Sequence, residues 1–80
     1  MKTISDLLNV FKREHPNIQI TDVYDDDDEL LVRVMSGNHA DFYFIKKSNG
    51  VSRAYFSRSE VSRVSRIIQN NKRITIQNEE

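Results

Sequence analysis

Four consecutive segments between residues 17 and 57 alternate apolar and polar side chains, and this pattern constrains the fold more than any other feature. Alternate residues of a β-strand point to the same face of a sheet. Short turns separate the segments, so each strand can pair with the next one in an antiparallel hairpin. The predicted strands cover residues 17–24, 30–36, 40–47 and 51–57. The sequence therefore predicts a four-stranded antiparallel meander.

One amphipathic helix is predicted before the meander and one after it. The first covers residues 4–14, where Thr3 can cap its start and Pro16 prevents its continuation. Ser57 or Ser59 can cap the second helix, which we expect to end near residue 70 or 71. The apolar residues at helical spacing are Ile4, Leu7, Leu8 and Phe11 in the first helix, and Val61, Val64, Ile67 and Ile68 in the second.

Alternation over residues 73–77 predicts a short fifth strand. The predicted fold class is therefore α+β, in the order α-β-β-β-β-α-β. Because 80 residues are too few for two independent cores, we expect a single compact domain over residues 1–80.

The hairpin register decides which face of the meander is buried, because a slip of one residue exchanges the two faces. Three-residue loops at 37–39 and 48–50 would gather the strand phenylalanines on one face and place Tyr43 and Tyr55 on the other. We expect both helices to pack on the phenylalanine face; one helix on each face is the alternative. A two-residue turn at Asn49-Gly50 is a competing register. The predicted core face consists of Ile18, Ile20, Leu30, Val32, Val34, Phe42, Phe44 and Phe56.

The other predicted face is too apolar for a surface that meets only water and too charged for an interior. Exposed apolar patches with arginine and tyrosine are typical of binding surfaces. The residues of this face are Leu31, Arg33, Met35, Tyr43, Ile45, Val51, Arg53 and Tyr55. Those predicted to bind a partner are Leu31, Arg33, Tyr43 and Tyr55.

The net charge of zero conceals an uneven distribution of charge. Residues 1–40 contain four basic and eight acidic residues, and residues 41–80 contain eight basic and four acidic ones, so the halves carry −4 and +4. The first hairpin loop contains the acidic run Asp25, Asp26, Asp27, Asp28 and Glu29. This contiguous run lacks the central glycine and alternating ligands of a calcium loop, so no metal is expected. It is either a solvated turn or an anionic site for a basic groove on a partner.

The basic residues of the second half lie mainly on the polar side of the second helix. These are Arg58, Arg63, Arg66, Lys72 and Arg73, while Lys46, Lys47 and Arg53 lie near the third hairpin. The candidate nucleic-acid-binding residues are Arg53, Arg58, Arg63, Arg66, Lys72 and Arg73. Arginines that neutralise phosphates, with tyrosines that stack on bases, could bind nucleic acid. The sequence pI of 6.7 is nevertheless far below that of dedicated nucleic-acid-binding domains, which is about 9 or more. A solvated helix face is the simpler interpretation.

Catalytic groups are scarce in this chain. It has no cysteine, its histidines are His15 and His39, and Gly37 and Gly50 are each needed for a turn. We therefore expect no enzyme and no cofactor. The absence of cysteine fits a reducing compartment, and no apolar stretch is long enough for a signal peptide or a membrane helix, so a cytoplasmic protein is expected.

In size, charge clustering and compactness, the chain resembles the small inhibitors that phages and other mobile elements use against host defence, including anti-CRISPR proteins. The resemblance implies a non-enzymatic protein-binding module whose acidic loop occupies a basic, nucleic-acid-binding groove on a partner, for example a nucleic-acid-processing enzyme. The alternative is a small nucleic-acid-binding domain that uses the second helix and the tyrosine face. The element order is also similar to that of the double-stranded-RNA-binding domain, but with an extra strand and without its lysine cluster. Homodimerisation through the semi-apolar face is compatible with either function.

Overall fold

The computed structural model describes residues 3–55, 58–70 and 73–74, and it contains an antiparallel meander with a helix before it and a helix after it. The meander consists of β1 (Gln19–Asp25), β2 (Glu29–Ser36), β3 (His39–Lys46) and β4 (Ser52–Ala54). The helices are α1 (Ile4–Glu14) and α2 (Val61–Asn70), and α2 continues from a 3-10 turn, η1 (Arg58–Glu60). The predicted α+β class and the four-stranded meander are confirmed. Within the described residues, no helix is long and apolar enough to span a membrane.

A two-residue ladder, β5 (Arg73–Ile74), pairs with β1 and gives the sheet order β4-β3-β2-β1-β5. In this ladder Val23 is opposite Ile74, and Tyr24 is opposite Arg73. Residues 75–77 of the predicted fifth strand lie outside the described residues. The full strand over 73–77 therefore stays a prediction.

Helix α1 has the boundaries that the sequence predicts, because both of its ends are determined by local side chains. The hydroxyl of Thr3 accepts a hydrogen bond from the Asp6 amide at 3.1 Å, and the Thr3 amide donates to the Asp6 carboxylate at 3.2 Å. This reciprocal pair is a capping box, which satisfies two amide donors at the helix start. At the other end the His15 amide donates to the Phe11 carbonyl at 3.0 Å, and Pro16 follows.

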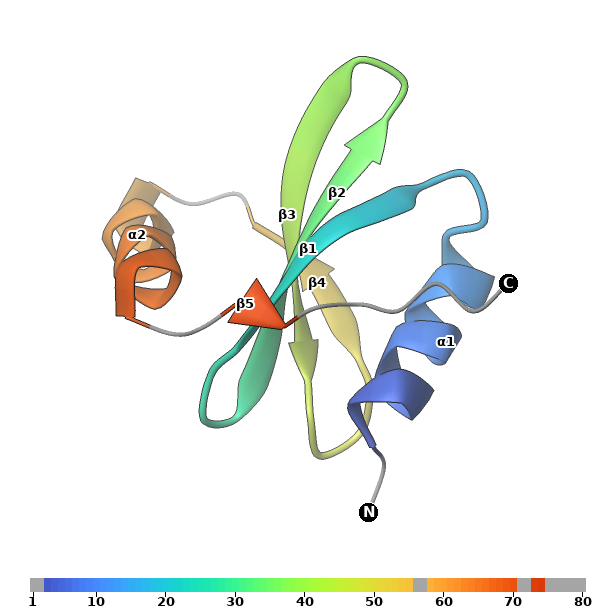
Figure 1. The fold of residues 1–80 in the computed structure, drawn as a ribbon, viewed down its shortest axis with the longest axis horizontal. Coiled ribbons are helices and arrows are strands. Elements are labelled where there is room, and N and C mark those ends of the chain that lie inside the picture. The colour runs from blue at the N-terminus through green and yellow to red at the C-terminus, as the bar shows by residue number, and fades with distance from the viewer. Residues whose placement is uncertain (1–2, 56–57, 71–72, 75–80) are drawn as a thin grey trace.

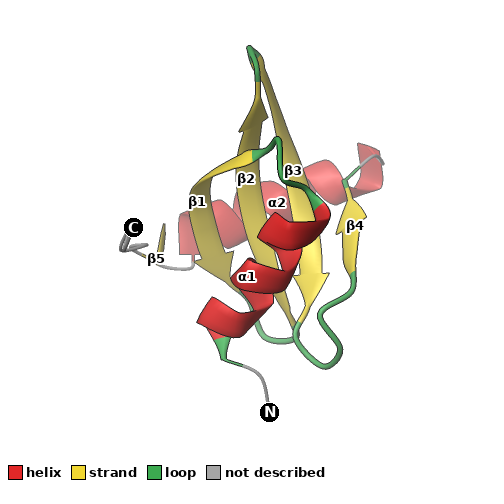
Figure 2. Ribbon diagram, turned by 90° about the vertical axis from the view of Figure 1, so that its right-hand side faces the viewer, coloured by secondary structure: helices red, strands yellow, loops and turns green. Residues whose placement is uncertain are grey.

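The two helices pack on opposite faces of the sheet, so the prediction that both lie on one face is wrong. Figure 1 shows α1 and α2 on either side of the strands, and in Figure 2 α1 lies in front of the sheet and α2 behind it. The buried core on the α1 side is formed by Leu7, Leu8, Phe11, Val23, Leu30, Val32, Val34 and Ile45. The smaller core on the α2 side is formed by Leu31, Phe44, Val64 and Ile67.

The error comes from hairpin registers that differ from the predicted ones by one residue. Ser36 pairs with His39, so the β2–β3 loop has two residues, and Gly37 has a φ of 63°. Glycine with positive φ at the first loop position is the pattern of a type II′ turn. In this register Phe44 is opposite Leu31, and Tyr43 is opposite Val32. The strand phenylalanines of β3 therefore face α2 instead of α1.

The β3–β4 hairpin is also displaced by one residue from its predicted register. The Lys46 amide donates to the Val51 carbonyl at 2.9 Å, which leaves the four-residue loop 47–50. Gly50 closes this loop with a φ of 76°, and its amide donates to the Lys46 carbonyl at 2.8 Å. Phe44 is consequently opposite Arg53 instead of Ala54.

A β-bulge in β1 and the burial of β2 on both of its faces determine which residues enter the two cores. The register of β1 against β2 shifts between Ile20 and Asp22, so Ile20 and Val23 both face α1 although they are three residues apart. Tyr24 faces α2. The central strand β2 contributes to both cores, and its consecutive residues 30–32 are all fully buried, with exposures of 0%.

Candidate functional site

The acidic loop is the tip of the β1–β2 hairpin. The Asp26 amide donates to the Glu29 carbonyl at 3.0 Å and closes the loop, so that Asp27 and Asp28 form its tip. Figures 1 and 2 show this tip at the same end of the sheet as the β3–β4 loop and the start of α1, whereas the β2–β3 loop lies at the opposite end. Three segments that are distant in sequence therefore meet at one end of the molecule.

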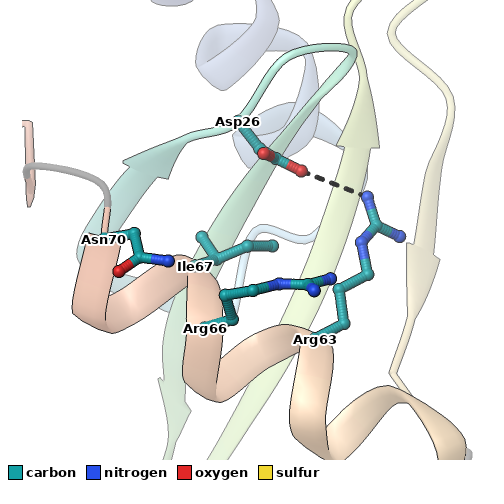
Figure 3. Close-up of a pocket in the computed structure, with 5 residues that line it drawn as sticks. All are labelled: Asp26, Arg63, Arg66, Ile67 and Asn70. Atoms are coloured by element: carbon teal, nitrogen blue, oxygen red, sulfur yellow. Dashed lines mark hydrogen bonds and ion pairs between the residues drawn. The ribbon is translucent and has the colours of Figure 1, made fainter.

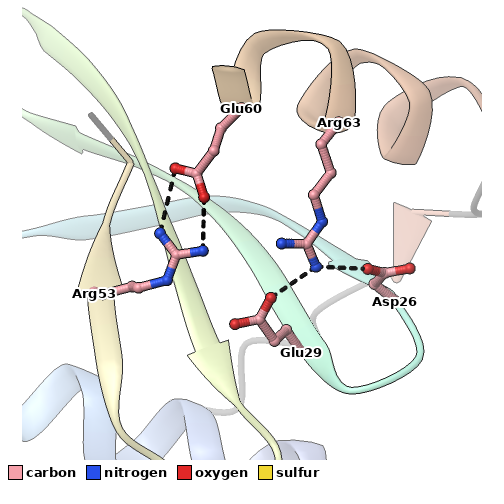
Figure 4. Close-up of polar contacts among 5 residues, drawn as sticks. All are labelled: Asp26, Glu29, Arg53, Glu60 and Arg63. Atoms are coloured by element: carbon pink, nitrogen blue, oxygen red, sulfur yellow. Dashed lines mark hydrogen bonds and ion pairs between the residues drawn. The ribbon is translucent and has the colours of Figure 1, made fainter. Parts of the chain in front are cut away.

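The carboxylates that flank the tip are paired with cations of the same chain. Arg63 of α2 donates through Nη2 to Asp26 Oδ2 at 3.2 Å and to Glu29 Oε1 at 2.7 Å (Figure 4). On the other side of the hairpin Asp25 forms an ion pair with Lys47, whose amide also donates to the Asp28 carbonyl at 2.9 Å. Three of the five acidic side chains therefore attach the loop to α2 and to the β3–β4 loop.

The two remaining carboxylates are free to meet a partner. Asp27 and Asp28 are exposed, and neither forms an ion pair with any other described residue. A cation on another molecule can therefore approach both carboxylates without displacing an internal ion pair.

A further ion pair holds η1, the turn that leads into α2, against the edge of the sheet. Arg53 donates to both carboxylate oxygens of Glu60, at 3.2 and 2.7 Å (Figure 4). The guanidinium carbons of Arg53 and Arg63 lie 4.6 and 4.9 Å from the centre of the Phe44 ring, so both cations also cover this buried aromatic side chain.

These contacts shift the ionisation of the paired groups. The hydrogen bond with Glu60 raises the pKa of Arg53, and the same bond lowers the pKa of Glu60. The pKa of Arg63 is raised chiefly by its hydrogen bond with Glu29. The Arg53–Glu60 pair is therefore stabilised in its charged form.

The structure does not bring the predicted partner-binding residues together on one surface. Leu31 is fully buried under α2, with an exposure of 0%. Tyr43 lies on the α1 side, where its ring is edge-on to Phe11 at 5.2 Å between centroids. Arg33 and Tyr55 are half-buried on the α2 side. The predicted semi-apolar face is therefore wrong, because the one-residue shift of β3 places its tyrosine on the face opposite Leu31.

The predicted basic residues also fall into separate groups. Arg53 and Arg63 are engaged in internal ion pairs, whereas Arg58 and Arg66 are exposed and form no ion pair with the described residues. Lys72 and the side chain of Arg73 lie outside the described part of the chain.

A small hollow of about 150 Å³ lies between α2 and the acidic loop (Figure 3). Its lining residues are Asp26, Arg63, Arg66, Ile67 and Asn70. Two of its lining residues, Asp26 and Arg63, form an ion pair with each other.

A larger groove of about 630 Å³ lies where the three segments meet. The start of α1 provides Ile4 and Leu7, the acidic loop provides Asp27 and Asp28, and the β3–β4 hairpin provides residues 46–48. Sequence reasoning did not find this groove, because it depends on which hairpin tips share an end of the sheet. The order of a meander contains that signal, since alternate loops lie at the same end.

Metal ligands are not gathered anywhere in the described part of the chain, where no three His, Asp or Glu side chains are placed to hold an ion. In the acidic loop the carboxylates of Asp25, Asp26 and Glu29 turn instead to Lys47 and Arg63.

Comparisons of the chain with protein-family models, curated proteins and solved structures find no match. The evidence on function is therefore the geometry of this chain itself.

Proposed function

We propose that this chain is a non-enzymatic protein-binding module of the inhibitor kind, whose acidic hairpin tip enters a basic groove on a partner protein. The observation that carries the proposal is the contrast within one loop. Asp27 and Asp28 are exposed at the tip, whereas the other three carboxylates pair with Lys47 and Arg63. A groove that normally holds nucleic-acid phosphates, as in a nucleic-acid-processing enzyme, has the complementary charge.

The internal ion pairs favour binding because they hold the tip in place before the partner arrives. A preorganised loop loses less conformational freedom on association than a mobile one. Its adjacent carboxylates can accept charge-assisted hydrogen bonds from arginine or lysine. Such complementarity mainly speeds encounter and excludes wrong partners. The absence of cysteine supports a cytosolic site of action.

The alternative, a nucleic-acid-binding domain that uses α2, has less support. Arg53 and Arg63 already form ion pairs within the chain, which leaves Arg58 and Arg66 as the arginines without an ion pair in the described part of this surface. The carboxylates that pair with Arg63 lie beside it and would repel phosphate groups.

Affinity capture from the native host's lysate, with and without nuclease treatment, tests the proposal. The double variant Asp27→Asn, Asp28→Asn removes the charge of the tip and leaves the three internal ion pairs in place. The matched control Glu14→Gln, Asp41→Asn removes two exposed charges elsewhere. We expect a protein that is captured by the wild type and the control independently of nuclease, and bound about tenfold or more weakly by the tip variant.

Two results would contradict the proposal. One is capture of the same protein with equal affinity by the tip variant. The other is recovery of nucleic acid alone, or of proteins that disappear after nuclease treatment, which would favour the basic helix as the binding site.

A further inference from the structure

We propose that the groove beside the acidic tip anchors an apolar side chain of the partner protein, next to an arginine or lysine that pairs with Asp27 or Asp28. This inference rests on the proposed function and specifies the chemistry of the segment that is bound. Three properties of the groove support the inference, namely its apolar lining, its charged lining and its volume.

The floor of the groove is apolar and rigidly held. It is formed by Leu7, which has an exposure of 1%, and by the half-buried Ile4. Ile4 is the first residue of α1 and lies between Thr3 and Asp6 of the capping box, and Leu7 belongs to the core on the α1 side. An apolar side chain placed here would remove the exposed part of Ile4 from water beside the already buried Leu7, without a rearrangement of the helix.

The walls of the groove carry more uncompensated negative charge than positive charge. Asp27 and Asp28 line the groove beside Lys46 and Lys47, since the Lys47 amide donates to the Asp28 carbonyl. Lys47 is already neutralised by its ion pair with Asp25, so two carboxylates lie near one unpaired ammonium group. A cationic segment therefore fits the groove better than an anionic one.

The size of the groove suits a few side chains. Its volume of about 630 Å³ falls within the range of roughly 300–1,000 Å³ that is typical of ligand sites. In an extended segment, residues two positions apart point to the same side. A partner segment of the form Arg-x-Phe or Lys-x-Leu can thus direct its cation to the tip and its apolar side chain to the floor.

Titration of the ¹⁵N-labelled chain with short peptides tests the inference directly. The probe is acetyl-Arg-Gly-Phe-Gly-Arg-amide, and the matched peptides replace Phe by Ser or both Arg by Glu. We expect saturable amide shifts at Ile4, Leu7, Asp27, Asp28 and Ser48 with the probe. The Ser peptide should bind about tenfold more weakly, because it lacks the buried ring. The Glu peptide should not bind measurably.

Two variants locate the anchor on the floor. Ile4→Gln should reduce the affinity for the Phe peptide to that for the Ser peptide. The control Val51→Gln changes an apolar residue with an exposure of 61% outside the groove lining, and it should have no effect. If Ile4→Gln perturbs folding, Ser48→Trp fills the groove from an exposed loop position and should block the Phe peptide in the same way.

The possible failures are distinguishable. If the Phe and Ser peptides bind equally and both lose affinity in the Asp27→Asn, Asp28→Asn variant, the apolar anchor is wrong while the acidic tip retains its role. If no peptide produces a saturable shift at low salt, the groove proposal is wrong, and the lysate experiment still decides the proposed function. If the chain alone dimerises and Ile4→Gln abolishes the dimer in light scattering, the occupant is a second copy and the inference is overturned.

Discussion

Arg63 is the residue that connects the acidic loop to the rest of the fold. It donates to Asp26 and Glu29, which precede it by 37 and 34 positions, and it also covers the ring of Phe44. Its side chain is 34% exposed, so solvent weakens these ion pairs without removing them. Arg63 therefore joins the acidic loop to α2, in addition to the apolar contacts of the core on the α2 side.

Replacement of Arg63 by methionine should destabilise the protein by about 1–2 kcal/mol, because two carboxylates lose their hydrogen-bond donor. Urea unfolding measures this loss. Arg66→Met is the matched control, since Arg66 is exposed and lies on the same helix, and it should change the free energy of unfolding by less than about 0.5 kcal/mol. Equal effects of the two variants would show that the Arg63 ion pairs contribute no net stability.

Because of Glu60, the free energy of unfolding should decrease at acidic pH. Its pKa is lowered in the folded state by the hydrogen bond from Arg53, so the folded protein binds this proton more weakly than the unfolded chain. The stabilisation is complete above the pKa of the unfolded chain, which is about 4.3, and is lost as the pH falls through the folded-state value.

We therefore expect the midpoint of urea unfolding to fall more steeply below about pH 4.3 in the wild type than in Glu60→Gln, whose side chain does not titrate. Parallel urea titrations of both proteins between pH 3 and pH 7 would measure the difference. Superimposable pH profiles would contradict a role for the Arg53–Glu60 pair.

Helix α2 is the element whose position the sequence analysis predicted incorrectly. Of the four residues predicted for its apolar stripe, Val64 and Ile67 are buried, whereas Val61 and Ile68 are exposed. The face on which the helix packs depends on β3, where a shift of one residue moves Phe44 from one face to the other. Two signals in the sequence favour the observed arrangement. Gly37 can occupy the first position of a two-residue turn, and the apolar run at residues 30–32 is typical of a strand that is buried on both faces.

Ile67→Ala should destabilise the fold by about 2–4 kcal/mol, because Ile67 has an exposure of 4% in the core between α2 and the sheet. The neighbouring Ile68 has an exposure of 38%, so Ile68→Ala is the control and should cost less than about 1 kcal/mol. Thermal unfolding of both variants would measure the two effects. If Ile68→Ala were the more damaging substitution, the assignment of the buried helix face would be wrong.

At the scale of the whole molecule, the opposite charges of the two halves partly neutralise each other within the fold. Carboxylates of residues 1–40 pair with Lys47 and Arg63 from residues 41–80. The sequence showed the segregation of charge but not the pairing, because the partners are brought together only by the hairpin registers and by the placement of α2. The capped start of α1, which depends on neighbouring side chains, was predicted correctly. The candidate site was predicted only in part, since the acidic tip was found and the groove beside it was not.

The strand β2 belongs to both cores, and this sharing has a consequence for how the molecule opens. Its residues 30–32 are covered by α1 on one side and by α2 on the other, while β1 and β3 pair with both of its edges. Loss of either helix alone would leave these backbone amides hydrogen-bonded and still shielded on one side. Their protons can therefore exchange with solvent only when the strands of the sheet separate. We expect the amides of β2 to be the slowest to exchange in the described part of the chain.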